Sequence, residues 1–474
     1  MQINETLIRD VVAQVLSEAT VPVVSHGTGN SRDHGVFHDA NAAVIAARRA
    51  FEQLQEMSMD DRKRIIDHIR RISIDQSVEL GTMEMNETKI GRLEHKIDKL
   101  KTLGLRSPGV EFMRSEVFSG DRGIAIVEHA PFGVIGAITP VTHSLPTITG
   151  NAVSMIAAGN SLVVNPHPSG KLVATEGVRR FNKAIYEDLG IDNLICVIAE
   201  PTLETADAIF SHRDVAIICV TGGPAVARAA LNSGKRAIVA GPGNPPVVVD
   251  ETADLQNAAK SIITGGAYDN NLLCIAEKEV FVVSSVFDEM MSQMEKAGAH
   301  LLNATQIQAL TKNAMIQVGD DQHDAPSKEF LGQDPEVLAH GAGVSIGAKT
   351  ELLFGETDHQ HPFVTVEQMM PFIPFVRVRD VDEGIALAKQ YEHGFRHTAI
   401  MHSTNVQNMT KMGRALDTTV FVKNGPSMAG LGLGGEGYPS FSIAGPTGEG
   451  VTTPLTFTRE RRSSLIGDLC VLGK

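Results

Sequence analysis

The chain has 474 residues, enough for two or three domains with sizeable cores, and its 42 Lys and Arg against 56 Asp and Glu give a formal net charge of −14. This acidic balance argues against non-specific nucleic-acid binding, and the absence of a run of about eighteen apolar residues argues against a membrane span. The four cysteines form no CxxC pair, so we expect free thiols in a reducing, cytoplasmic compartment.

Residues 1–18 are predicted to form an amphipathic helix. They have no basic leader and no small-residue cleavage site, so a secretory signal is not expected. Residues 19–35 are rich in Ser, Gly, Asn and His, which is typical of a flexible linker. Such a helix can pack on its own body or a partner subunit, or it can bind another protein. The apolar stripe consists of Ile3, Leu7, Ile8, Val11, Val12, Val15 and Leu16.

Residues 36–239 are predicted to form a first α/β domain. The pattern up to about residue 101 is helical with charged faces, and a β-hairpin is expected at about 115–130, with its turn at 120–123. Apolar strands such as "GVIGAIT" and "SLVVNP" then alternate with helices. This alternation indicates a parallel, doubly wound sheet, which binds ligands at the carboxyl ends of its strands.

Residues 240–430 repeat the alternation, with strands expected at "PPVVVD", "EKEVFVV", "VSIGA", "FVRVRD" and "HTAIMHS". The segment 431–474 is glycine-rich and then strand-like in "TPLTFTRE". The predicted fold class is therefore α/β, with two doubly wound, Rossmann-like domains followed by a C-terminal extension.

One cysteine, Cys274, follows "DNNLL" and precedes the predicted strand "EKEVFVV". A loop just before a strand can expose a thiol and direct backbone N–H groups at an oxyanion. The alternative is an inert core cysteine, which is the commoner case. Cys196 and Cys219 lie inside apolar strands and are predicted to pack in the core, and Cys470 is predicted to lie at the surface or an interface.

Six further segments follow one another in order along the chain: "PFGVIGAITP" (131–140), "AAGNSLVVNPHP" (157–168), "VTGGPAVA" (220–227), "AGPGNPPVVVD" (240–250), "NNLLCIAEKEVFV" (270–282) and "EQMMPFIPFVRV" (367–378). Together they resemble the aldehyde dehydrogenase superfamily, whose members carry a cysteine nucleophile at the position of Cys274. The resemblance implies that Glu367 holds the nicotinamide ribose of NAD, and that the two α/β domains are accompanied by an oligomerisation extension formed by the hairpin and residues 431–474.

The cofactor site follows from this resemblance and from one physical observation. Residues 221–223 open a helix after a buried strand, where a phosphate can reach the helix N-terminus. The only G-x-G-x-x-G match, at 432–437, has no preceding strand and is predicted to be a loop. The expected NAD-binding residues are Thr139, Pro140, Asn165, His167, Pro168, Thr221, Gly222, Gly223, Ala240, Gly241 and Glu367.

The interdomain segment lacks the glutamate that activates water in hydrolytic aldehyde dehydrogenases. The matching stretch, residues 239–242, reads Val-Ala-Gly-Pro. Without that base, water attack on a thioester should be slow. The chain thus resembles the CoA-acylating branch, in which coenzyme A enters the same cleft as NAD. A hydrolytic enzyme that uses another base remains the alternative.

The implied mechanism begins with attack of the Cys274 thiolate on an aldehyde. The Cys274 N–H, with Thr142 or His143, would stabilise the oxyanion; His143 stands where the family usually has asparagine. His397 is a candidate base for a thiol, and a structural histidine is the alternative. "DHQH" (358–361) is predicted to be a polar loop, so no metal site is expected.

Enzymes of this branch that belong to bacterial microcompartments carry an N-terminal helix and linker that direct them into the protein shell. The chain looks most like the propionaldehyde dehydrogenases of propanediol utilisation, with an acetaldehyde-specific enzyme as the alternative. The resemblance implies a short-chain aldehyde substrate, a shell protein bound through residues 1–18, and a homodimer or homotetramer. A non-catalytic shell adaptor is the competing class, against which the Cys274 and Glu367 segments argue.

Overall fold

The computed structural model describes residues 33–319 and 322–469. The helix predicted in residues 1–18, most of the linker predicted at 19–35, and Cys470 lie outside the described residues. Contacts divide the chain after Asp33, and all features below belong to the unit that begins at His34. Within the two described ranges, no helix is both long and apolar enough to cross a membrane.

The first sheet has six parallel strands in the order β1-β6-β5-β4-β7-β8. Three of its central strands, β4, β5 and β6, are buried along their whole length, as expected for strands that are covered on both faces. The strands are β1 (Val36–Phe37), β4 (Val134–Thr139), β5 (Ser161–Pro166), β6 (Ile195–Ile198), β7 (Val215–Thr221) and β8 (Arg236–Ala240).

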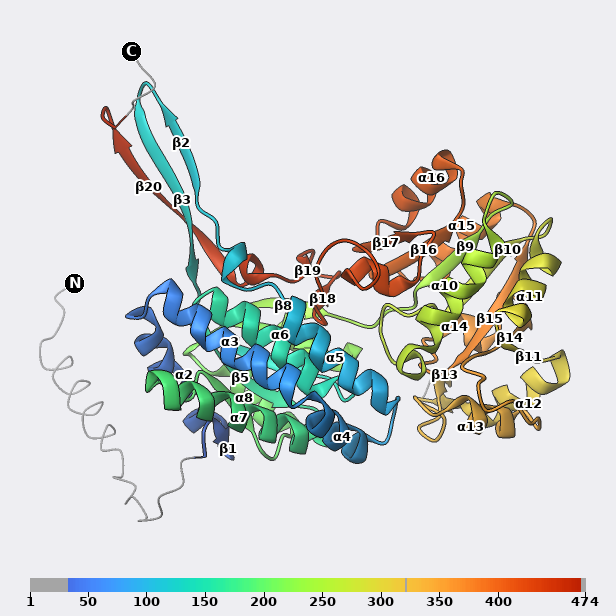
Figure 1. Ribbon diagram of the computed structural model, residues 1–474, viewed down its shortest axis with the longest axis horizontal. Coiled ribbons are helices and arrows are strands. Elements are labelled where there is room, and N and C mark those ends of the chain that lie inside the picture. The colour runs from blue at the N-terminus through green and yellow to red at the C-terminus, as the bar shows by residue number, and fades with distance from the viewer. Residues whose placement is uncertain (1–32, 320–321, 470–474) are drawn as a thin grey trace, which may run out of the picture. The chain divides into compact units, whose positions relative to one another are not determined.

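Helices cover both faces of this sheet (Figure 1). One core joins the strands to α3, α6 and α7, and a second core joins them to α2, α8 and α9. Helix α5 packs against α3, α4 and α6. The helices are α2 (Ala40–Gln55), α3 (Met59–Asp75), α4 (Ser77–Thr88), α5 (Leu93–Arg106), α6 (Ser144–Ala157), α7 (Lys171–Leu189), α8 (Leu203–Ser211) and α9 (Pro224–Asn232).

The second sheet has seven parallel strands in the order β11-β14-β15-β10-β9-β16-β17. The prediction of two doubly wound sheets is therefore confirmed. The strand expected at "VSIGA" (344–348) is wrong: this stretch is irregular, and the next strand of the sheet, β14, begins only at Leu353. The strands are β9 (Pro246–Val249), β10 (Glu279–Val283), β11 (His300–Leu301), β14 (Leu353–Thr357), β15 (Phe372–Val378), β16 (Thr398–His402) and β17 (Val420–Lys423).

Helices also cover both faces of the second sheet. Its core against α10 and α11 lies on one face, and its core against α15 and α16 lies on the other. A small hairpin, β12 (Met315–Val318) and β13 (His323–Pro326), follows α12. The helices are α10 (Leu255–Ala267), α11 (Phe287–Lys296), α12 (Ala304–Ala314), α13 (Pro335–Gly341), α14 (Pro362–Thr365), α15 (Val381–Tyr391) and α16 (Val406–Leu416).

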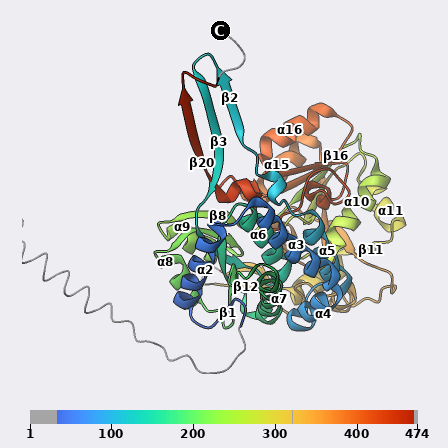
Figure 2. The same ribbon diagram turned by 60° about the vertical axis from the view of Figure 1, so that its left-hand side comes forward.

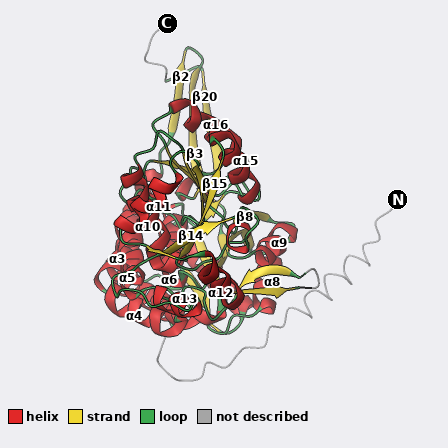
Figure 3. Ribbon diagram, turned by 90° about the vertical axis from the view of Figure 1, so that its right-hand side faces the viewer, coloured by secondary structure: helices red, strands yellow, loops and turns green. Residues whose placement is uncertain are grey.

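A separate antiparallel sheet joins β2 (Glu116–Gly120), β3 (Gly123–Pro131) and β20 (Thr458–Ile466). These strands extend beyond the helices in all three views (Figures 1, 2 and 3). The predicted hairpin is thus confirmed. The strand predicted at "TPLTFTRE" begins late, because Thr453 and Thr456 form a capping box around a 3₁₀ turn, η5 (Pro454–Phe457).

Candidate active site

The segment before Cys274 has an unusual backbone. Asp269, Asn270 and Asn271 have φ of 50°, 54° and 66°, so three consecutive non-glycine residues are left-handed. They belong to the 3₁₀ segment η3 (Tyr268–Asn271), which follows α10. Asn and Asp tolerate this conformation best, yet a run of three is costly and persists only where its surroundings fix it. The backbone is therefore strained in the three residues 269–271, shortly before Cys274 in the chain.

The three described cysteines differ in environment. Cys196 and Cys219 are fully buried in β6 and β7, as the sequence predicted. Cys274 is partly exposed and packs beside an apolar cluster that includes Leu273, Ile275 and Phe441. Of these three, Cys274 alone is accessible to a substrate.

Gly243 lies where Cys274, His397 and Glu367 meet. A Cβ placed on Gly243 would lie 2.4 Å from the Cys274 carbonyl oxygen and 3.1 Å from His397 Cγ, so only glycine fits. The Gly243 N–H also lies close enough to the Glu367 carboxylate to lower its pKa. The segment that links the two sheets thus brings together the predicted nucleophile, the candidate base and the predicted ribose ligand.

Lys278 is a fully buried cation next to this group, and the sequence analysis did not single it out. Its Nζ donates to the Asn271 carbonyl oxygen at 2.8 Å and to the Asn271 side-chain oxygen at 2.5 Å. Its charge acts on Cys274, Glu367 and His397. The available signal was its position, four residues after the cysteine at the start of a buried strand, where a lysine is rarely found.

The pKa values at this site are set mainly by burial. Burial raises the pKa of the Cys274 thiol to about 12; the Glu367 charge also raises it, and Lys278 lowers it. Burial raises the pKa of Glu367 to about 7, against the opposing effects of Lys278 and the Gly243 N–H. Burial, with Lys278, lowers the pKa of His397 to about 4. At neutral pH, a protonated thiol therefore lies near a neutral imidazole.

His397 has one free ring nitrogen. Its Nδ1 lies 2.9 Å from Thr398 Oγ1, and its main-chain N–H donates to Glu392. Its buried Nε2 finds no hydrogen-bond partner among the described residues. A neutral imidazole with an unpaired nitrogen can accept a proton, so the geometry is compatible with a base.

Thr142 and His143 lie in the loop between β4 and α6. His143 Nε2 is 3.0 Å from Thr142 Oγ1, and the His143 ring contacts Phe441 edge-on at 5.1 Å between centroids. Burial, with Lys99 and Lys96, holds the pKa of His143 well below its usual range. The two side chains hydrogen-bond to each other rather than to Cys274, which packs against the apolar cluster that contains Phe441. Their role at an oxyanion stays a prediction.

Nearly all of the predicted cofactor residues lie at the carboxyl ends of β5, β4, β7 and β8, which are adjacent strands of the first sheet. Thr139 ends β4 with a buried hydroxyl that has no partner among the described residues. Nothing lies within 4 Å of a Cβ placed on Gly222 or Gly223, at the start of α9. An unpaired donor and an open helix N-terminus fit a nucleotide. The other members of this edge are Pro140, Asn165, His167, Pro168, Thr221, Ala240 and Gly241.

Two other motifs have structural explanations. Gly432–Gly437 form a turn after the 3₁₀ segment η4 (Ser427–Leu431), as predicted. In the "DHQH" segment, His361 lies 3.2 Å from Thr311 Oγ1, and His359 lies 2.8 Å from the Tyr391 hydroxyl. Among residues 33–319 and 322–469, no three His, Cys, Asp or Glu side chains gather as metal ligands.

Comparison with known proteins identifies the class to which this fold belongs. The sequence model of the aldehyde dehydrogenase family matches residues 31–438, and the chain belongs to this family. The acetylating acetaldehyde dehydrogenase EutE of Salmonella typhimurium is 42% identical over 464 residues, which cover 98% of each chain. The CoA-propanoylating propanal dehydrogenase of the same organism is 40% identical over 463 residues, 97% of each chain.

Solved structures give the same result. The propionaldehyde dehydrogenase of Rhodopseudomonas palustris with bound propionyl-CoA has a TM-score of 0.89 and 42% identity, and the match covers 95% of this chain and 100% of that one. A propionaldehyde dehydrogenase from the fucose utilisation microcompartment of Clostridium phytofermentans has a TM-score of 0.89 and 40% identity, over 92% of this chain and 100% of that one. The likeness thus extends over both sheets.

Proposed function

We propose that the chain is a CoA-acylating aldehyde dehydrogenase. It would convert an aldehyde, NAD⁺ and coenzyme A to acyl-CoA, NADH and a proton. One observation carries the assignment: residues 239–243, which run past Cys274, offer no side chain that can take a proton from water. The acylating relatives, and the R. palustris enzyme solved with CoA and an acylated cysteine, support it.

In the first half-reaction, Cys274 Sγ bonds to the aldehyde carbon after its proton has left, and His397 Nε2 is the candidate acceptor. The carbonyl oxygen becomes an oxyanion near the Cys274 N–H, with Thr142 or His143 as the candidate second donor. NAD, when bound, supplies the acceptor for the hydride of this intermediate. Its phosphates would lie at the start of α9, and its nicotinamide ribose at Glu367.

In the second half-reaction, the sulfur of coenzyme A bonds to the acyl carbon and the Cys274 thiolate leaves. The attacking thiol must also lose its proton, and the same His397 nitrogen can accept it.

A second candidate function, hydrolysis of the acyl-enzyme, has one observation in its favour. Because the pKa of Glu367 is about 7, half of its carboxylates are ionised near neutral pH, and Glu367 could activate water in a hydrolytic enzyme.

The finer assignments rest on the relatives. We propose a short-chain substrate with propionaldehyde favoured over acetaldehyde, NAD as the cofactor, and residence in a cytoplasmic bacterial microcompartment whose shell binds residues 1–18. The domain limits 1–18, 19–35, 36–239, 240–430 and 431–474 are proposals, as is a homodimer or homotetramer formed through β2, β3 and β20. Exposed apolar side chains on those strands, including Phe118 and Ile466, support the last proposal.

Product analysis with and without coenzyme A tests this function. Enzyme, NAD and aldehydes of two to four carbons should give the matching acyl-CoA only when coenzyme A is present, with the highest kcat/KM for three carbons. Steady formation of free acid without coenzyme A would favour the hydrolytic candidate. The absence of NADH formation with every aldehyde would favour a non-catalytic adaptor.

A further inference from the structure

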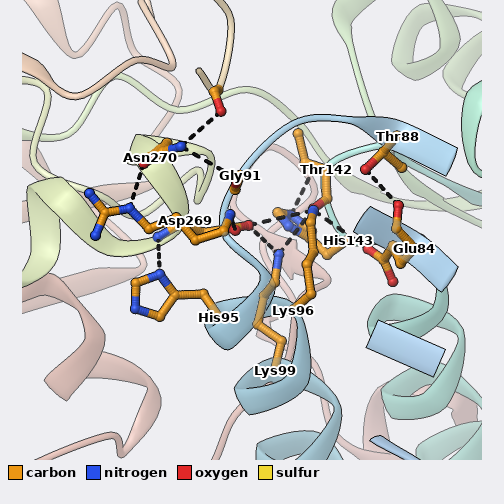
Figure 4. Close-up of polar contacts among 12 residues, drawn as sticks. Glu84, Thr88, Gly91, His95, Lys96, Lys99, Thr142, His143, Asp269 and Asn270 are labelled. Atoms are coloured by element: carbon orange, nitrogen blue, oxygen red, sulfur yellow. Dashed lines mark hydrogen bonds and ion pairs between the residues drawn. The ribbon is translucent and has the colours of Figure 1, made fainter. Parts of the chain in front are cut away.

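Two lysines on α5, Lys96 and Lys99, are buried between Thr142 and Asp269 (Figure 4). Their Nζ atoms donate to the Thr142 carbonyl oxygen at 2.9 and 3.0 Å, respectively. Lys99 Nζ also donates to Asp269 Oδ2 at 2.5 Å, and Lys96 Nζ lies 3.7 Å from the same oxygen. One pair of ammonium groups therefore contacts both the loop after β4 and the segment before Cys274.

The charges in this cluster are incompletely balanced. Asp269 forms a close ion pair with Lys99. The buried Glu84 carboxylate lies farther from its cation, at 3.7 Å from Lys96 Nζ. Neither oxygen of the Glu84 carboxylate has a hydrogen-bond partner among the described residues. Burial raises the pKa of Glu84 and lowers that of Lys99 to about 8. Buried ion pairs are often no more stabilising than apolar side chains of the same size, and their best-attested use is to fix a register.

The same helix fixes the strained backbone before the nucleophile. The Arg92 N–H donates to Asp269 Oδ1 at 2.9 Å, and Arg92 Nε donates to the Asn270 side chain at 2.7 Å. The Asp269 N–H donates to His95 Nδ1 at 2.9 Å. The N-cap Arg92 and the first turn of α5 thus supply the contacts that a left-handed run needs in order to persist.

We propose that Lys99, supported by Lys96, is a positioning residue for the reaction at Cys274. By holding Asp269 and the Thr142 carbonyl at once, it sets the spacing between the Cys274 loop and the loop that carries Thr142 and His143. This inference rests on the proposed function, because it assumes that the reaction takes place at Cys274. A displacement of about 1 Å between such groups can cost as much as 100-fold in rate.

The test compares Lys99→Met, Asp269→Asn and the double variant with Lys101→Met, an exposed lysine on the same helix. NADH fluorescence titration counts the folded cofactor sites, and kcat is expressed per site. We expect kcat to fall roughly 10- to 100-fold in both single variants while KM for the aldehyde and Kd for NADH change less than about twofold. The double variant should lose less than the product of the two single losses. Lys101→Met should match the wild type.

A purely structural role predicts a lower melting temperature with an unchanged kcat per site, and that result overturns the proposal. If Lys99→Met does not fold, kcat of the double variant decides, because Lys99→Met with Asp269→Asn removes both charges of the ion pair and leaves no single buried charge behind. If the double variant does not fold either, the pair serves the fold and the proposal is overturned. A wild type that makes no acyl-CoA would instead refute the proposed function, independently of these variants.

Discussion

The two parts of the candidate site are built differently. The edge of the first sheet presents uncharged groups, with a buried threonine hydroxyl at Thr139 and open backbone at Gly222 and Gly223. The region around Cys274 is dense in buried charge, with Lys278 after it in the chain and Asp269, paired to Lys99, before it. The difference matches the proposed roles: a nucleotide can be held by backbone and helix termini, whereas a thiol reaction depends on protonation states.

The largest expected effect comes from removing the sulfur. Cys274→Ala should abolish NADH formation and leave Kd for NADH unchanged, because the cofactor edge does not depend on the thiol. Cys219→Ala, the matched buried cysteine, should keep full activity and lose about 1 kcal/mol of unfolding free energy. Residual turnover of more than a few per cent in Cys274→Ala would show that another group is the nucleophile.

His397→Asn tests the base on the charged side. Because Nε2 is the ring nitrogen of His397 without a partner among the described residues, we expect kcat to fall by about 10²- to 10⁴-fold, the usual range for general-base catalysis. NADH binding should not change. Activity close to that of the wild type would assign His397 a structural role, through its contacts with Thr398 and Glu392.

Gly222→Val tests the uncharged side. The structure has room for the new side chain, so the fold should tolerate it, but the valine would occupy the space where a phosphate reaches α9. Kd for NADH should rise roughly tenfold, which corresponds to about 1.4 kcal/mol. The rate of Cys274 alkylation by iodoacetamide should stay at the wild-type value. An unchanged Kd would place the phosphates elsewhere.

The pH dependence of alkylation tests Lys278. Because the pKa of Cys274 is raised to about 12, the thiolate fraction is small at neutral pH, and the alkylation rate should keep rising well above pH 9. Lys278 lowers this pKa, so Lys278→Met should raise it further and slow alkylation at any given pH, by about tenfold for one pKa unit. A titration midpoint near 7 in the cofactor-free wild type would contradict the burial argument. Lys260→Met, at an exposed position, is the control.

Deletion of residues 1–18 should have the smallest effect on the chemistry. We expect kcat and KM within about twofold of the full chain, because the linker predicted at 19–35 uncouples the segment from the candidate site. Co-purification with microcompartment shells should be lost. Shell association that survives the deletion would favour a helix that packs on its own enzyme.

Much of the fold was predictable, because buried parallel strands are continuous apolar runs and the helices between them are amphipathic. The wrongly predicted or missed strands lie in segments where the apolar pattern is short or absent. "VSIGA" is a short apolar run without a paired neighbour, and the two-residue strands β1 and β11 are too brief to leave a pattern. Thr453–Thr456 form a local cap that competes with the extended conformation.

The site was predictable in part. The loop position of Cys274 and the strand ends of the first sheet follow from local pattern, and the structure places them as expected. The burial of Lys96 and Lys99 could not be predicted from local pattern, because lysines on a helix normally lie on its solvent-exposed face. Their burial depends on Asp269 and Thr142, which lie more than forty residues away in sequence. Long-range contacts of this kind leave no signal in a single sequence.

The proposed reaction requires an acyl-Cys274 thioester that is stable to water until coenzyme A reacts with it. The most direct measurement is the mass of the enzyme after mixing with propionaldehyde and NAD, with peptide mapping of the adduct. The account predicts a propionyl group on the Cys274 peptide that persists without coenzyme A and appears as propionyl-CoA when coenzyme A is added. Rapid conversion to propionate without coenzyme A, or an adduct on another residue, would contradict it.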